Sequence, residues 1–177
     1  MASRHRSRER ALQILYQWEL RRRLEESFEE RRRGAPGDPE AAPAPKSFTV
    51  ADAAEAYYRS LGSEDDVAET ARDPFAEELV EGVAAHRREL DELIASHSSH
   101  WRLERMSAVD RNILRLAAYE MMHTPTPAPI VLDEALKLAE RYSGEKAVAF
   151  INGVLDAIRR SLGIEGSEGR RRSGADK

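Results

Sequence analysis

Hydrophobic residues recur at intervals of three and four along most of the chain, which is the spacing of amphipathic helices. The first segment with this pattern begins after Ser3. Its apolar positions are Ala11, Leu12, Leu15, Tyr16 and Trp18. No stretch sustains the alternation of apolar and polar residues that predicts a strand. The chain is therefore predicted to be all-α.

Capping signals and breaks divide this pattern into separate helices. We expect helices over residues 4–20, 49–62, 74–96, 107–123, 131–142 and 146–162. Thr49 with Asp52 and Ser107 with Asp110 have the spacing of capping boxes, and Asp73 is a predicted N-cap before a proline at the first helical position. The helix over 74–96 is expected to be continuous, with His86 on its apolar face.

Charged and then proline-rich residues separate the first two helices. Residues 21–33 can prolong the first helix through Glu/Arg pairs three or four apart, whereas the four prolines between residues 34 and 47 exclude a regular helix. We interpret residues 21–47 as an exposed, partly disordered insertion. The expected organisation is an N-terminal helical subdomain over 1–96, a C-terminal helical subdomain over 97–163 and a disordered tail over 164–177.

Arginine is concentrated at the start of a chain whose net charge is −4. Arg4, Arg6, Arg8 and Arg10, with His5 among them, fall in the first turns of the first predicted helix. Cations at a helix N-terminus cost about 0.3–1 kcal/mol each, because the macrodipole is positive there. Folding does not call for these arginines, so their placement favours an anionic partner.

Composition removes several classes of function. The chain has no cysteine, which excludes disulfides, thiolate metal sites and thiol nucleophiles. No apolar run approaches the roughly 20 residues of a membrane span and no signal peptide is evident, so a cytoplasmic protein without membrane contact is expected. His97 and His100 have metal-ligand spacing, but no further His, Cys or acidic cluster completes a site, so no metal is predicted.

The motifs of common enzymes are also missing. The sequence contains no glycine-rich phosphate loop, no nucleophile elbow and no HExxH motif. We therefore predict a binding module rather than an enzyme, with no cofactor.

Three segments carry a resemblance to a known family. They are RSRERALQILYQWE, VDRNILRLAAYEM and VLDEALKLAERYSGEKAVAFINGVLDAI, in this order. Over residues 4–20 and about 50–162 the chain resembles the NusB family of bacterial transcription antitermination factors. The resemblance implies two packed bundles of about seven helices. It also implies binding to boxA RNA of nascent ribosomal transcripts together with NusE, a small-subunit ribosomal protein, and thereby support of elongation by RNA polymerase.

The resemblance also implies which residues make these contacts. The implied RNA-binding residues are Arg4, His5, Arg6, Arg8, Arg115, Lys146 and Phe150. The implied NusE contacts are Tyr16 and Asp110. Arginine suits this role because its planar fork grips phosphate and stacks on unpaired bases. The resemblance suits Phe150 to base stacking, whereas its periodicity places it on the apolar stripe of the last helix, and the two interpretations are equally open.

Two other hypotheses stay open at this point. The same helical domain occurs in ribosomal RNA cytosine methyltransferases, but that enzyme needs a downstream methyl-donor domain with catalytic cysteines, and this chain ends at Lys177 without any. A purely structural helical adaptor would show no RNA affinity even with its protein partner present.

Overall fold

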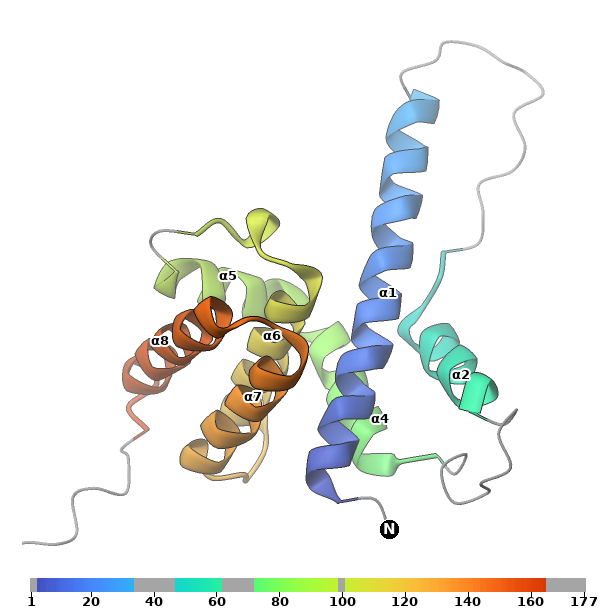
Figure 1. Cartoon of the computed structure of the whole chain (residues 1–177). Coiled ribbons are helices and arrows are strands. Elements are labelled where there is room, and N and C mark those ends of the chain that lie inside the picture. Colours follow the sequence, from blue (N-terminus) through green and yellow to red (C-terminus); the bar gives the residue numbers. More distant parts are fainter. Residues whose placement is uncertain (1–2, 34–46, 62–71, 99–100, 165–177) are drawn as a thin grey trace, which may run out of the picture. The chain divides into compact units, whose positions relative to one another are not determined.

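The structure is a computed structural model that describes residues 3–33, 47–61, 72–98 and 101–164. These residues form seven α-helices and one 3-10 helix, with no strand among them, which confirms the all-α prediction (Figure 1). The helices are α1 (Arg4–Arg33), α2 (Val50–Leu61), α4 (Pro74–Ala85), α5 (Arg87–His97), η1 (Leu103–Arg105), α6 (Ala108–His123), α7 (Ala128–Tyr142) and α8 (Glu145–Ser161). None of these helices is long and apolar enough to cross a membrane.

Contacts divide the chain into two compact units, between Glu81 and Gly82 in α4. We call residues 1–81 unit 1 and residues 82–177 unit 2. The sequence-based boundary was placed later, at residue 96, near the end of α5.

Helix α1 is longer than the helix expected over residues 4–20, because it continues without a break to Arg33. The first part of the expected insertion is therefore helical. Ion pairs one turn apart support this extension, with Arg22 Nη2 lying 2.7 Å from Glu26 Oε1. The backbone N–H of Phe48 also donates to the carboxylate of Glu25 at 3.1 Å, which holds the segment before α2 against the extension. Residues 34–46 and 165–177 lie outside the described residues.

The core of unit 1 forms where α1 packs beside α2 (Figure 1). Its buried apolar residues from these helices are Ala11, Leu12, Ile14, Leu15, Trp18, Ala53, Ala54, Tyr57 and Tyr58. The capping box at the start of α2 is confirmed. The N–H of Asp52 donates to Thr49 Oγ1 at 3.2 Å, and the N–H of Thr49 donates back to Asp52 Oδ2 at 2.8 Å.

The single helix expected over residues 74–96 is wrong, because it is interrupted at His86. There φ is −101° and ψ is 11°, values between the α and extended regions, and α4 and α5 lie on either side. The apolar period continues across this residue, which is why the sequence pattern did not reveal the break. His86 is half-buried rather than part of the core.

Helix α6 lies at the centre of unit 2, packed against α5, α7 and α8. Every residue from Arg111 to Glu120 is buried, including three that carry charge. The predicted cap at its start is confirmed by the bond from the N–H of Asp110 to Ser107 Oγ at 3.0 Å. Because α5, α7 and α8 all pack on α6, this helix positions the side chains that they present to one another.

Candidate nucleic-acid interface

The arginine-rich start of α1 presents some of its cations to solvent and buries others. Arg4 and Arg6 are exposed and His5 is half-buried. Arg8, which the resemblance also implies as an RNA contact, is only 3% exposed. The guanidinium carbons of Arg4 and Arg8 lie 4.5 and 5.5 Å from the ring centroid of Phe75, within cation–π distance. The Phe75 ring thus helps to orient two cations at the start of α1.

Arg10 is a structural residue of unit 1. Its Nη1 lies 3.3 Å from Asp73 Oδ2, and both side chains are less than a tenth exposed. The other oxygen of Asp73 accepts a hydrogen bond from the N–H of Ala76, which confirms Asp73 as the N-cap of α4. The hydroxyl of Tyr58 accepts from the N–H of Asp73 at 3.1 Å. The buried carboxylate of Asp73 therefore gives Arg10 a structural role that the sequence alone did not indicate.

A second group of candidate residues lies at the start of α8 in unit 2. Lys146 is exposed and Phe150 is half-exposed, four residues apart and hence on one face of the helix. The ring of Phe150 lies 6.0 Å from that of Trp101, centroid to centroid, and Trp101 is 55% exposed. Phe150 is thus outside the buried core of α8 and belongs to a surface that carries two aromatic rings and a lysine.

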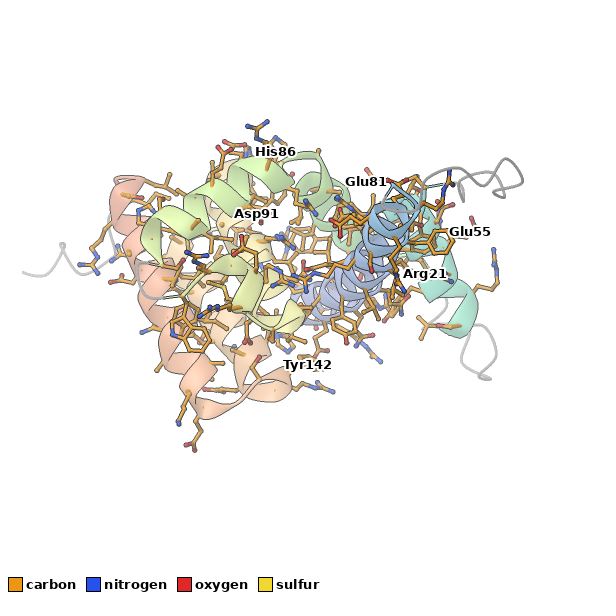
Figure 2. The ribbon with its side chains drawn as sticks, turned by 90° about the horizontal axis from the view of Figure 1, so that it is seen from above. Arg21, Glu55, Glu81, His86, Asp91 and Tyr142 are labelled. Atoms are coloured by element: carbon orange, nitrogen blue, oxygen red, sulfur yellow. The ribbon has the colours of Figure 1, made fainter. Side chains whose placement is uncertain are left out.

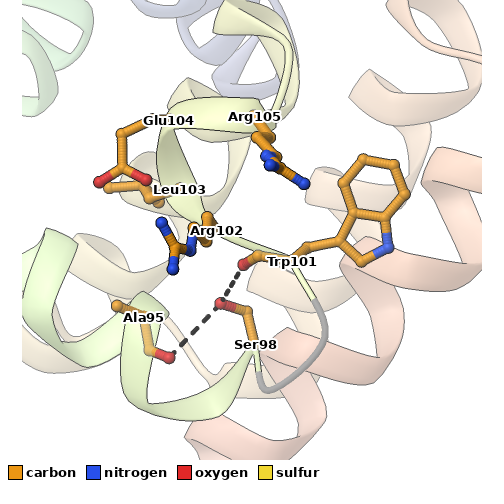
Figure 3. Close-up of a pocket in the computed structure, with 7 residues that line it drawn as sticks. All are labelled: Ala95, Ser98, Trp101, Arg102, Leu103, Glu104 and Arg105. Carbon is orange, nitrogen blue, oxygen red and sulfur yellow. Dashed lines mark hydrogen bonds between the residues drawn. The ribbon is translucent and has the colours of Figure 1, made fainter.

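The segment before α6 adds cations to this surface. A pocket lies there (Figure 3), lined by Ala95, Ser98, Trp101, Arg102, Leu103, Glu104 and Arg105. The Ser98 hydroxyl donates to the carbonyl of Trp101 at 3.1 Å, which holds the backbone beside the indole. Arg102 and Arg105 are exposed. Sequence reasoning did not select these residues, although an aromatic residue followed closely by two arginines, WRLER, is a usable signal.

Arg115, which the resemblance implies as an RNA contact, is buried in the structure. It is 4% exposed, and its Nε and Nη2 donate to the two carboxylate oxygens of Asp91 at 2.6 and 2.9 Å (Figure 2 labels Asp91 on α5). Its Nη1 also donates to Asn112 Oδ1 at 3.2 Å. This bidentate pair joins α5 to α6. An RNA contact through Arg115 stays a prediction.

The two residues expected to contact NusE lie in different units. Tyr16 is 40% exposed on α1, so it is not part of the core that its spacing also allowed. Asp110 is half-buried, and its Oδ1 accepts a hydrogen bond from the hydroxyl of Ser143 at 2.5 Å. This bond ties the start of α6 to the turn that precedes α8. Their role as partner contacts stays a prediction.

These features define a small all-helical protein whose exposed cations and aromatic rings suit a binding function. Solved structures share the fold. Crystals of antitermination factors NusB and NusE in complex with dsRNA contain a chain that matches 90% of this one and 99% of its own length, with a TM-score of 0.62 and 24% identity. T. maritima NusB matches 90% of this chain and 92% of its own, with a TM-score of 0.61 and 27% identity.

Sequence relatives define the family. The model of the NusB family matches residues 5–160. A transcription antitermination protein NusB of Solibacter usitatus is 46% identical over 162 residues, which cover 92% of each chain. The protein of the same name from Myxococcus xanthus is 37% identical over 89% of this chain and 95% of its own. The chain belongs to the NusB family.

Proposed function

We propose that this protein is an RNA-binding antitermination factor of the cytoplasm. It binds a boxA-type single-stranded RNA together with NusE, and the assembly supports processive elongation by RNA polymerase. The observation that carries the proposal is the family membership, since relatives named for transcription antitermination match almost the whole chain. A solved structure of the same fold comes from a complex of NusB, NusE and dsRNA, which supports RNA and NusE as the partners.

In unit 1, Arg4 and Arg6 are the residues proposed to contact phosphate. Both are exposed in the first turn of α1, where a cation is unfavourable for the helix itself and a bound anion is favourable. Arginine grips a phosphate with two parallel N–H bonds, so two exposed arginines are enough to hold a short piece of backbone. His5 is proposed to add a contact between them. Arg8 is proposed to act indirectly: it contacts the ring of Phe75, which in turn positions the guanidinium of Arg4 for phosphate.

In unit 2, Lys146, Phe150 and Trp101 are proposed to bind a second part of the RNA. Unpaired bases stack on exposed aromatic rings, and such stacking contributes about 1–3 kcal/mol for each base. Lys146 lies in the first turn of α8, where backbone N–H groups and the helix dipole also favour a phosphate. An exposed indole beside a second ring offers the stacking surface that a single strand needs and a duplex cannot use.

The test is a titration of fluorescently labelled boxA-type RNA with the full chain, with and without NusE, at several salt concentrations. We expect modest affinity for the protein alone and tighter binding with NusE. For the double variant Arg4→Ala and Arg6→Ala we expect weaker binding and a smaller salt dependence. Removing one cation–phosphate pair should make the slope of log K against log salt shallower by about 0.7.

A matched control removes the same charge elsewhere. Arg59 and Arg88 are exposed and pair with glutamates one turn away, so replacing both with alanine removes two cations without touching either proposed RNA surface. This double variant should bind RNA as the unmodified protein does. Equal reductions in affinity in the two double variants would mean that only net charge matters and would reject the site on α1.

The alternatives predict different outcomes. A structural adaptor binds no RNA with or without NusE. A duplex-binding protein prefers the same sequence annealed to its complement. The methyltransferase hypothesis is not favoured, since relatives named as antitermination proteins are matched over 92–95% of their length.

A further inference from the structure

Two histidines and a carboxylate gather within unit 2, where α5 begins and α6 ends. They are His86, in the junction of α4 and α5, Glu89 in the first turn of α5, and His123, the last residue of α6 (Figure 2 labels His86). One ligand atom from each of the three lies within 4.8 Å of the other two. All three belong to unit 2.

The ring of His86 is held in a defined state. Its Nδ1 lies 2.9 Å from the carbonyl oxygen of Gly82. A carbonyl only accepts hydrogen bonds, so Nδ1 must carry the proton, and in the neutral ring Nε2 presents its lone pair. Metal-binding histidines are commonly oriented in this way, with one nitrogen donating to a carbonyl while the other binds the ion.

The other two ligands face this ring. The His86 and His123 ring centroids lie 4.2 Å apart, and His123 Nε2 lies 3.9 Å from Glu89 Oε2. Tyr119, one turn before His123 on α6, stacks on the His123 ring with centroids 5.0 Å apart. The Tyr119 ring is itself buried against Gly82. The buried Tyr119 ring therefore covers one side of the cluster, and the other side is open to solvent.

We propose that His86, Glu89 and His123 form a binding site for a divalent transition metal of the zinc class. Two imidazole nitrogens and one carboxylate oxygen are a zinc donor set, whereas Mg²⁺ and Ca²⁺ prefer oxygen alone. Bonds of about 2.0 Å in tetrahedral geometry place ligand atoms roughly 3.3 Å apart. The side chains of Glu89 and His123 are at the surface, so small rotations bring them to this spacing. Water completes the coordination. The bound ion joins the start of α5 to the end of α6.

His97, the last residue of α5, provides a matched control. His97 has the same local hydrogen bond, from Nδ1 to the carbonyl oxygen four residues earlier, also at 2.9 Å. It differs because no other His, Asp or Glu among the described residues joins it in a group of three. If a histidine with this local hydrogen bond were enough to bind zinc, replacing His97 would weaken zinc binding as much as replacing His123.

The test is a zinc titration of the full chain, with any purification tag removed, in competition with a chromophoric chelator. We expect one Zn²⁺ per chain, four-coordinate absorption bands when Co²⁺ is used instead, and a rise in melting temperature with added Zn²⁺. His123→Ala and Glu89→Gln should each weaken zinc binding at least tenfold. Both replace surface side chains, so neither should change the melting temperature of the zinc-free protein by more than a few degrees. His97→Ala should leave the affinity within twofold.

The proposal fails if the unmodified protein binds no stoichiometric zinc at micromolar concentration. It also fails if His123→Ala retains the full affinity, or if His97→Ala weakens zinc binding as much as His123→Ala. None of these results bears on RNA binding, because the variants leave both proposed RNA surfaces intact.

Discussion

Replacing Gly82 with alanine should destabilise the protein, although alanine is the better helix former. A Cβ atom added at Gly82 would overlap the far end of the Tyr119 side chain, at Cζ, Cε2 and the hydroxyl oxygen. The Tyr119 ring cannot simply swing aside, because it is 8% exposed and has the ring of His86 at 5.7 Å and that of His123 at 5.0 Å. Insertion of a methyl group into such a contact costs about 1–3 kcal/mol.

A second glycine separates the tertiary effect from the helical one. Gly153 lies in α8, is exposed, and has nothing within 4 Å of where its Cβ would be. Gly153→Ala should therefore stabilise the protein by about 1 kcal/mol, the difference in helix propensity. Gly82→Ala has the same favourable propensity and the opposing overlap cost, so we expect a net destabilisation of up to about 2 kcal/mol. For a chain of this size this lowers the melting temperature by up to roughly 8 °C.

Urea unfolding followed by circular dichroism measures the free energy of unfolding of both variants. A third variant tests whether overlap with Tyr119 is the cause of the destabilisation. Tyr119→Leu removes the atoms that the new methyl group meets, so in this background Gly82→Ala should become neutral or stabilising, as Gly153→Ala is. The reasoning is refuted if Gly82→Ala is as stabilising as Gly153→Ala in the unmodified protein, or if Tyr119→Leu does not reverse its effect.

Two further predictions concern alkaline stability and the partner surface. Burial raises the pKa of Tyr58, while its hydrogen bond with the backbone of Asp73 lowers it, and the net shift is upward. The folded state therefore holds the phenol proton when the unfolded chain has released it, so stability should fall as the pH rises above about 10. Measured by unfolding at increasing pH, the free energy of unfolding should fall less for Tyr58→Phe than for the unmodified protein. Tyr16→Phe, which replaces an exposed phenol, should show the same fall as the unmodified protein. Asp110→Lys should reduce the gain in RNA affinity from NusE, whereas Ser143→Ala, which removes the same hydrogen bond and keeps the charge, should not; equal effects would make Asp110 a structural residue only.

Local features of the fold were predictable from the sequence. The caps at Thr49, Asp73 and Ser107 were identified because a cap involves residues only three apart, and short-range spacing is visible in a sequence. The all-α class follows from a hydrophobic period that persists through each helix. Family membership followed from three ordered segments, and the family model spans them.

The burial of charged residues could not be predicted from the sequence pattern. Arg8, Arg10 and Arg115 are each less than a tenth exposed, although nothing in the sequence gives a reason to expect any of them in the interior. Arg10 finds its carboxylate 63 residues along the chain and Arg115 finds Asp91 24 residues earlier. Periodicity indicates which face of a helix is buried, but it carries no information about which opposing helix brings a countercharge to that face.

The exposed and clustered residues depended on tertiary structure for the same reason. Phe150 fitted the apolar stripe by its spacing and base stacking by the resemblance, and only the tertiary structure shows that it is partly exposed beside Trp101. His86 and His123 lie 37 positions apart in the sequence and were not considered together. They meet because Tyr119 packs on Gly82 and thereby brings the end of α6 to the start of α5. The sequence alone determined the all-α class, most of the helices and the family, since these follow from short-range pattern. Only the packing of one helix on another decided which charges are paired and which side chains form a site, because these are contacts between residues far apart in the chain.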